Sequence, residues 1–246
     1  MKTLKLIAWS AAALGTLLCA APAAAQDGYL LGSPLGSLTL RLGGAHPAAS
    51  DDLFRFMTDN LTLGKSDFAS FTAGIDLNVK VHRQVDFVVG FSTAQMEARS
   101  EFRDFVEDPN DLPIEQTTEL VRTPVTAGLR VHLTPRGRSL GRYAFVPNKF
   151  NPYVGAGGGV MYYRITQDGD FVDFETLDIF TEFFEDSGWT PTWYAQAGTD
   201  IWLLSRLGLN LEARYNWAKD ELDEDFADFD NIDLRGLQWS IGITLR

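Results

Sequence analysis

Acidic side chains dominate four segments of this chain, and carboxylates in turning loops are the ligands that Ca²⁺ prefers. The segments are residues 46–67, 101–115, 168–186 and 220–233. They contain 26 of the 33 acidic residues, and their only Lys or Arg residues are Arg55, Lys65 and Arg103. The candidates for metal ligands are Asp168 with Asp170 and Asp223 with Asp225, and neither pair continues as an EF-hand. A solvated polyanionic rim is the simpler interpretation. We therefore expect no cofactor, and a loop-bound Ca²⁺ stays open as the alternative.

A second pattern, Phe-x-Asp-Phe, occurs in three of the acidic segments. Its phenylalanines are Phe102, Phe105, Phe171, Phe174, Phe226 and Phe229. Acid alone would suffice for a solvated rim, so the repeated aromatic residues predict that the loops bury apolar surface against one another, or that they gate a hydrophobic ligand. We expect Phe105, Phe174 and Phe229 to be at least partly buried, and Asp104, Asp173 and Asp228 to turn outward or to cap neighbouring backbone.

The third acidic segment also contains apolar residues at helical spacing. Phe174, Leu177, Phe180 and Phe184 follow Asp173, a possible N-cap. This spacing predicts a short amphipathic helix.

Residues suited to catalysis are sparse. His46, Ser50 and a loop acid can be drawn as a triad, but a loop histidine beside Pro47 is more often inert. The sequence therefore predicts that the protein is not an enzyme.

Eight stretches of alternating apolar and polar residues must position these loops. They are residues 38–42, 72–81, 85–99, 115–133, 152–160, 193–203, 209–217 and 237–245. The clearest sets Leu209, Leu211 and Ala213 against Asn210 and Glu212. Residues 152–160 have small residues in both parities, so which face of that strand meets the exterior stays open.

The charged residues of these strands lie opposite a continuous apolar face. We expect an ionic network inside a barrel, formed by Arg41, Asp76, Arg122, Asp200, Glu212 and Arg214. The interior of an eight-stranded barrel is only wide enough for side chains, so mixed charges there should pair and block it. The outward positions, among them Leu211, Ile241 and Ile243, should face lipid. A soluble barrel would show the reverse arrangement.

The N-terminus has the pattern of a secretory signal peptide. Lys2 and Lys5 precede an apolar run from Leu6 to Leu18, and Ala23, Ala24 and Ala25 supply small residues before a cleavage site. We expect residues 1–25 to be a signal peptide and residues 26–246 to form one barrel domain. The formal net charge of −12 argues against nucleic acid as a partner.

The chain resembles the eight-stranded outer-membrane barrel superfamily of OmpA, OmpX and OmpW, in its generic outer-membrane β-barrel domain form. The resemblance lies in the signal sequence, the strand count, the alternation of short and long turns, the stretch Pro152 to Gly157, and the final amphipathic strand. It implies an all-β fold: an eight-stranded antiparallel up-and-down transmembrane β-barrel with four long outer loops. It also implies export to the outer membrane of a Gram-negative-type bacterium. The implied partners are outer-membrane lipid, lipopolysaccharide and the barrel-assembly machinery, and we favour a monomer.

Three functions remain open at this point. The favoured one is a non-enzymatic barrel with a charge-plugged lumen and an acidic, aromatic outer crown, serving surface interaction or envelope integrity. The alternative is OmpW-like binding or passage of small hydrophobic molecules, which requires a lateral opening, with the glycine-rich strand at residues 152–160 as the place to look. A rim-located enzyme that modifies lipid A through His46 is the less favoured third.

Overall fold

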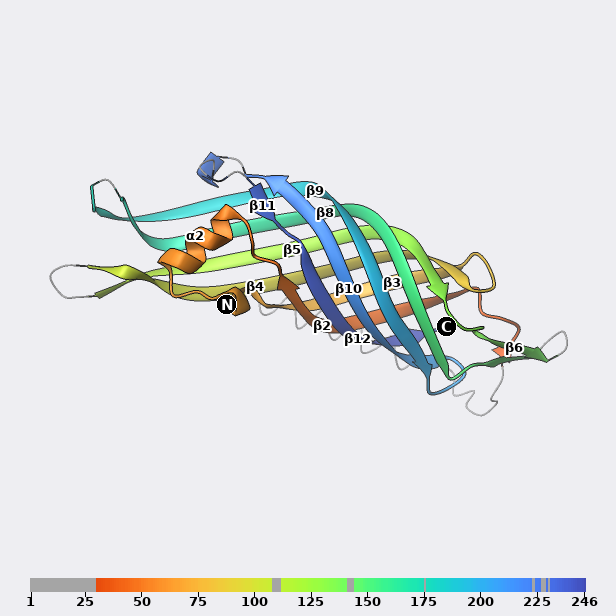
Figure 1. The fold of residues 1–246 in the computed structure, drawn as a ribbon. Helices are drawn as coiled ribbons and strands as arrows, with labels where there is room; N and C mark the ends of the chain where they lie inside the picture. Colours follow the sequence, from red (N-terminus) through yellow and green to blue (C-terminus); the bar gives the residue numbers. More distant parts are fainter. Residues whose placement is uncertain are drawn as a thin grey trace.

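Eight antiparallel strands form a closed ring in the computed structural model (Figure 1). The structure describes residues 30–107, 112–140, 144–174, 176–222, 224–226, 229 and 231–246, so the expected signal peptide lies outside the described residues. The strands of the ring are β2 (Gly36–Pro47), β3 (Ser70–Lys80), β4 (Val85–Glu107), β5 (Leu112–His132), β8 (Phe150–Val172), β9 (Ile179–Trp202), β10 (Leu207–Glu221) and β12 (Gly236–Leu245). Each strand pairs with the next one along the chain, and β12 pairs with β2 to close the ring. The predicted fold class is therefore confirmed.

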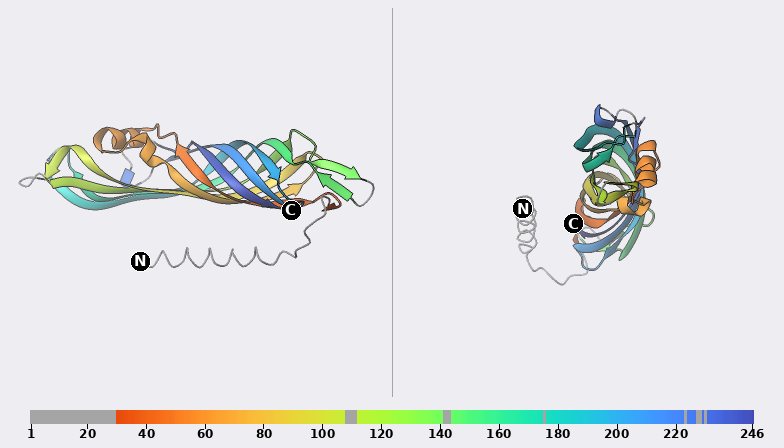
Figure 2. Two further views of the ribbon diagram at one scale, coloured as in Figure 1. Left: turned by 90° about the horizontal axis from the view of Figure 1, so that it is seen from below. Right: turned by 90° about the vertical axis from the view of Figure 1, so that its left-hand side faces the viewer.

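The remaining elements lie at the two ends of the barrel. One end, called the inner end below, contains a small sheet of β1 (Leu30–Leu31), β7 (Ala144–Pro147) and β6 (Gly137–Leu140), which projects beyond the ring (Figure 2). The opposite, outer end contains helix α2 (Asp52–Asn60), the 3-10 turns η1 (Lys65–Phe68) and η2 (Glu224–Phe226), and β11 (Asn231–Asp233). No helix in the described part of the chain is long and apolar enough to cross a membrane.

The wall of the barrel is much taller on one side than on the other. Strands β4, β5, β8 and β9, called the tall half below, contain 23, 21, 23 and 24 residues. Strands β2, β3, β10 and β12, the short half, contain 12, 11, 15 and 10 residues. The predicted loop boundaries at 101–115 and 168–186 are therefore wrong, because most of both segments is strand. Helix α2 lies alongside the tall half, at the level where the short half has ended (Figures 1 and 2).

The helix expected after Asp173 is also wrong. Residues 173, 174 and 176–178 lie in a turn, in which the backbone N–H of Leu177 donates to Asp173 O and Asp173 N–H donates to Asp178 O. Leu177 has a φ of 62°, a left-handed conformation that ends a right-handed helical turn. Strand β9 begins two residues later, and it pairs Phe180 with Phe171.

The glycine-rich strand β8 is resolved in both its facing and its pairing. Tyr153 and Met161 are buried inside, whereas Val154 and Val160 are exposed outside. A Cβ at the inward Gly157 would lie 2.8 Å from the ring of Tyr194, so glycine makes room for that aromatic side chain. Because β8 pairs with β5 and β9 along nearly its whole length, the structure shows no lateral opening at this strand.

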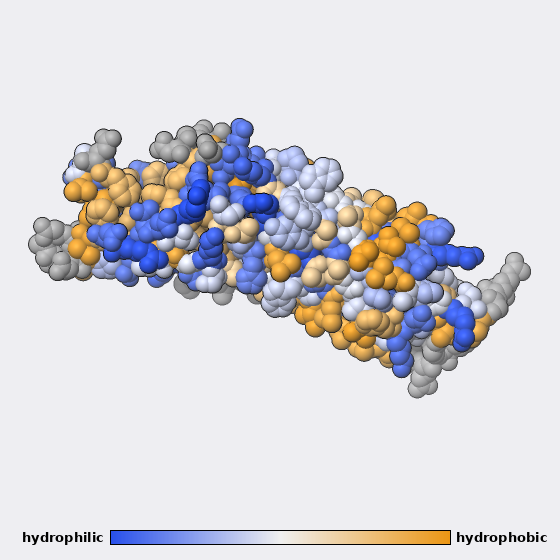
Figure 3. Space-filling model, viewed as in Figure 1, coloured by the Kyte–Doolittle hydropathy of each residue, from blue (hydrophilic) through white to orange (hydrophobic). Residues whose placement is uncertain are grey.

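A band of exposed apolar side chains surrounds the inner part of the barrel. Its members point outward from all eight strands, as Leu42, Ile75, Val89, Leu129, Val154, Trp193, Leu211 and Ile241 illustrate. Exposed Trp189, Trp193, Trp217 and Trp239 lie toward the outer edge of this band, where aromatic residues form the interfacial girdle of membrane barrels. Orange, hydrophobic side chains gather over the right-hand half of Figure 3, and hydrophilic ones cover the region of α2. This surface fits a hydrocarbon layer around the inner part and water around the outer part.

Candidate functional site

The inner half of the barrel is filled by an ion cluster of three arginines and two carboxylates. Arg41 bonds Asp76 at 2.9 Å and Glu212 at 3.1 Å, and Arg214 lies 3.1 Å from Glu212. Arg130 adds a contact of 3.2 Å to Glu212. All five side chains are at most 3% exposed. They come from strands β2, β3, β5 and β10, so the cluster joins opposite sides of the wall.

Neutral hydrogen-bond partners hold the cluster in place. Tyr153 donates its hydroxyl to Glu212 at 2.8 Å and accepts from Asn210 at 2.8 Å. The ring of Tyr153 also lies under the guanidinium of Arg130, 4.0 Å from its centroid. Asn210 donates to Asp200 at 2.7 Å, and no Arg, Lys or His nitrogen of the described residues lies within 4.0 Å of Asp200. Asp200 is therefore linked to the cluster through an amide instead of an ion pair.

Arg122 is set apart from the cluster. Its guanidinium donates to the hydroxyl of Ser70 at 3.3 Å and to the carbonyl of Leu234 at 3.4 Å. Within the described residues it has no carboxylate oxygen closer than 4.0 Å, although only 6% of the residue is exposed. The structure thus places four of the six expected network members together, Arg41, Asp76, Glu212 and Arg214. Arg130 was not among the six, although it alternates with the apolar Leu129 and Val131 and so lies on the inward face of its strand. Tyr153 could not be placed from the sequence, because small residues in both parities left the facing of its strand open.

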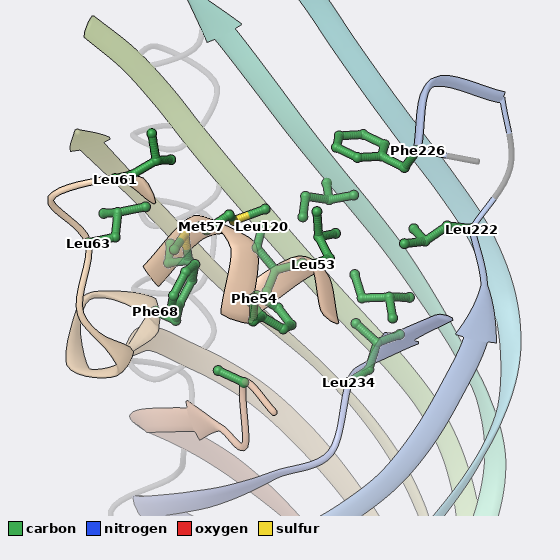
Figure 4. Close-up of a cluster of buried hydrophobic side chains, with 14 of the residues drawn as sticks. Leu53, Phe54, Met57, Leu61, Leu63, Phe68, Leu120, Leu222, Phe226 and Leu234 are labelled. Carbon is green, nitrogen blue, oxygen red and sulfur yellow. The ribbon is translucent and has the colours of Figure 1, made fainter. Parts of the chain in front are cut away.

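The outer half of the barrel is filled by an apolar core instead of charges. Its buried members, called the outer core below, include Leu53, Phe54, Met57, Leu61, Leu63, Phe68, Met96, Phe102, Ile114, Leu120, Met161, Tyr163, Ile165, Val172, Leu222, Phe226, Ile232 and Leu234 (Figure 4). Helix α2 supplies the centre of it. The helix begins because the carboxylate of Asp51 accepts from the N–H of Phe54 at 2.8 Å, an N-cap that leaves Leu53, Phe54 and Met57 on one face.

The sequence contained a signal for this helix. Acidic Asp51 and Asp52 precede apolar residues at positions 53, 54, 57 and 61, which share one side of a helix. The helix was not predicted, because its four apolar positions form a weaker pattern than the aromatic residues at 174–184.

The first two Phe-x-Asp-Phe motifs meet directly at the outer core. The ring centroid of Phe174 lies 6.3 Å from that of Phe102 and 5.9 Å from that of Phe105. Phe102 is buried and Phe105 is half-buried, but Phe174 is 51% exposed. Asp104 is exposed, and Asp173 caps the adjacent turn by accepting from Thr176 N–H at 3.2 Å.

The third motif joins the second through intervening rings. Phe184 lies 4.7 Å from Phe171 and 6.2 Å from Phe226, and both of these motif residues are buried. Phe229 contacts Phe56 of α2, with 5.5 Å between centroids. Asp228 lies outside the described residues. The three motifs therefore converge, and the first phenylalanine of each one is buried more deeply than the second.

The candidate metal ligands are not gathered around one point. Asp170 accepts from the hydroxyl of Thr181 at 2.6 Å, and Asp225 accepts from the N–H of Glu185 at 3.0 Å. Asp168 is exposed on β8, and Asp223 lies outside the described residues. Within the described ranges, no group of three or more His, Cys, Asp or Glu side chains is arranged to hold a metal.

Ser50 and His46 make different contacts. Ser50 donates to Asp233 at 2.8 Å, and His46 is exposed on β2, opposite the outward-facing Leu237. The described residues contain no hydrogen bond between His46 and Ser50, so the geometry of a triad is not assembled.

A polar junction fastens α2 to the short half of the wall. Asp51 accepts from the backbone N–H of Asp233, and Arg235 bonds the carboxylate of Asp233. Burial raises the pKa of Asp51 above its usual range. Burial also acts to raise the pKa of Asp233, but the hydrogen bonds from Arg235 and Ser50 outweigh it and hold that pKa below its usual range. Asp233 is therefore kept ionised where it tethers the loop.

A closed eight-stranded barrel with a lipid-facing band, an ionic interior and a folded outer end defines the class of outer-membrane β-barrels. The chain belongs to the outer membrane protein beta-barrel domain family, whose model matches residues 10–246. Membership of this family indicates the outer membrane of a Gram-negative bacterium.

Several solved structures are similar over most of the chain, at low identity. Neisserial surface protein A is 13% identical, with 87% of this chain and 98% of that chain covered and a TM-score of 0.48. OprG from Pseudomonas aeruginosa is 14% identical, with 88% and 98% covered and a TM-score of 0.47. Ail from Yersinia pestis, in complex with the heparin analogue sucrose octasulfate, is 11% identical, with 86% and 99% covered and a TM-score of 0.41. No curated protein sequence matches the chain significantly.

Proposed function

We propose that this protein is a closed, non-enzymatic outer-membrane barrel whose outer end is an interaction surface. Closure is supported by two successive plugs, the ion cluster in the inner half and the outer core beneath α2. A path along the lumen would have to break buried ion pairs and then displace a folded apolar core. Both steps are costly compared with leaving the barrel shut.

The observation that carries the interaction surface is an exposed apolar tip on the β8–β9 hairpin. Its members are Phe174, Leu177, Ile179, Phe180 and Phe183, which are 39% to 63% exposed. The hairpin lies at the far outer end, away from the band that faces lipid (Figure 1). An apolar patch exposed to water, with acidic residues around it, is typical of a surface that binds a partner.

Closure is tested by recordings across planar bilayers that contain the purified protein. We expect no large stable conductance. A steady wide pore would contradict the closed barrel. It would not bear on the proposal that the tip of the β8–β9 hairpin binds a partner.

The interaction surface is tested with Leu177→Ser combined with Phe183→Ser on cells that display the protein. Both side chains are at least half exposed, so the barrel should assemble normally. We expect attachment to other cells or surfaces to fall by about tenfold, the factor that corresponds to ~1.4 kcal/mol of binding. Leu140→Ser, at an equally exposed position on β6 at the inner end, is the matched control and should have no effect.

A role in envelope integrity makes a different prediction for the same variant. A strain that lacks the protein would become sensitive to detergent, and the Leu177→Ser, Phe183→Ser double variant would restore resistance fully. Detergent sensitivity without any change in attachment would favour integrity over interaction.

Passage of small hydrophobic molecules remains the second candidate, because one observation favours it. The short half ends below the top of the tall half, and above it the loop between β2 and β3, which contains α2, covers the apolar interior. The loop is attached to β4 by backbone hydrogen bonding between Thr62 and Glu101 at 2.9 Å. A disulfide from Thr62→Cys with Glu101→Cys would hold the loop shut, and the natural sequence contains only Cys19. Loss of uptake on oxidation, restored by reduction, would support passage.

A further inference from the structure

Among the arginines buried inside this barrel, Arg122 is the exception. Arg41, Arg130 and Arg214 each contact a carboxylate, whereas the contacts of Arg122 are with one hydroxyl and one carbonyl oxygen. Both of those hydrogen bonds are long, at 3.3 and 3.4 Å. Arginine does not lose its proton in proteins, so this buried cation lacks a countercharge among the described residues.

A small cavity adjoins Arg122 at the boundary between the ion cluster and the outer core. Polar groups of Thr72, Ser92, Asn216 and Gln238 line it, together with apolar Pro124 and Met161. The Oδ1 atom of Asn216 is buried and has no hydrogen-bond partner among the described residues. Rotation of that amide by half a turn would direct its NH₂ donors into the cavity. A guanidinium, hydroxyls and an amide thus surround one space.

We propose that this cavity binds a small carboxylate, of the size of formate or acetate, with its oxygens against Arg122. A carboxylate matches the planar fork of a guanidinium, and its charge compensates the buried cation. Water could occupy the same space but would leave the charge uncompensated. Apolar Pro124 and Met161 line the same small cavity beside its polar groups, which suits an acid with one short apolar group.

The test measures how anions shift the unfolding equilibrium of the full-length protein in detergent micelles. Urea unfolding is followed in sodium formate or acetate, with ionic strength held constant by sodium gluconate, a carboxylate that is too large for the cavity. At ten times its dissociation constant, a bound anion should raise the folded-to-unfolded ratio about tenfold. With gluconate as the sole added carboxylate, the folded-to-unfolded ratio should not change as the gluconate concentration rises.

The decisive variant is Arg122→Met, with Arg99→Met as the matched control on the exposed face of β4. Removing an uncompensated buried charge is neutral or stabilising, so Arg122→Met should fold at least as well as the wild type without formate or acetate. It should also lose the response to both anions, which Arg99→Met should retain.

Three outcomes would overturn the proposal. The first is an equal response of wild type and Arg122→Met to formate. The second is stabilisation by chloride but by neither carboxylate. The third is destabilisation by Arg122→Met that is the same with and without the anions, which would show that Arg122 acts only through Ser70 and Leu234.

Discussion

The inner and the outer half of the barrel, taken along its axis, contain opposite kinds of side chain: charged ones in the inner half and apolar ones in the outer half. Inside the band of exposed apolar side chains, the interior contains the ion cluster, and beyond that band the interior contains the outer core. The two sets of side chains depend on different parts of the chain. The ion cluster joins strands that are far apart in sequence, such as Arg41 with Glu212, whereas the outer core is centred on one short helix. Damage to the first should therefore affect the whole barrel, and damage to the second should remain local.

The largest effect should follow Glu212→Ala. This carboxylate contacts Arg41, Arg130 and Arg214, so its loss leaves three buried cations with Asp76 as the remaining carboxylate partner. We expect a loss of about 3–5 kcal/mol in the free energy of unfolding, measured by urea unfolding in micelles. Glu97→Ala, at an exposed position on β4, is the control and should change little. A loss below ~1 kcal/mol would show that the cluster does not hold the wall together.

Phe54→Ala should have a comparable local effect without unfolding the barrel. Phe54 is fully buried, and its ring lies 4.8 Å from Phe68. Truncation of a buried phenylalanine costs about 3–4 kcal/mol, here in the stability of the α2 segment. Limited proteolysis should cut between residues 50 and 68, while the ring of strands stays resistant. If Phe54→Ala unfolds the entire barrel, the two halves are not independent.

A smaller effect should follow a charge on the lipid face of the inner half. Ile241→Arg places a cation in the exposed apolar band and should cost about 2–3 kcal/mol when the barrel is in a bilayer. The control is Val106→Arg, an outer position that is equally exposed but lies beyond the band. Equal tolerance at both positions would contradict the placement of the membrane around the inner half.

The smallest effect concerns the junction of α2 with the short half. The pKa of Asp233 is lowered, so its contribution to stability is present above the ordinary carboxyl pKa near 4 and is lost as the pH falls toward the lowered value. Asp233→Asn should reduce protection of the α2 segment by about 1 kcal/mol at pH 7. Below pH 4 the protease sensitivities of variant and wild type should converge. A difference that persists at low pH would mean that the tether does not depend on the charge.

The membrane-facing part was predictable from sequence because lipid imposes a strict alternation of period two. Leu209 to Trp217 follows it without interruption, and the structure confirms both the strand and its outward face. Beyond the apolar band the outward face of the strands is polar, so the apolar-polar alternation is lost. The outer parts of β4, β5, β8 and β9 were therefore predicted to be loops. The helix predicted after Asp173 failed for a related reason. Phe180 and Phe184 are four residues apart, and this spacing suits one face of a strand as well as one face of a helix.

The interior was predictable as a set of residues but not as a set of contacts. Parity places Asp76, Arg122 and Asp200 inside, but which arginine meets which carboxylate depends on the stagger of the strands around the ring. That stagger brings Asp76 and Glu212 to Arg41 and leaves Arg122 beyond reach of either. Because β8 has glycines in both parities, the sequence does not show which of its residues face inward. The hydrogen bond from Tyr153 to Glu212 could therefore not be predicted.

The pairing of β12 with β2 has a consequence for how the protein comes into being. Leu38 pairs with Leu245 and Thr39 with Thr244, so the first and last strands of the ring are separated by nearly the entire chain. The ring cannot close until β12 is available to pair with β2, and until then the sheet has two open edges. Such non-local pairing makes folding slow. After export, the chain should therefore remain unclosed for some time and need protection from aggregation. A truncation that removes only β12 should leave a chain that never closes its ring.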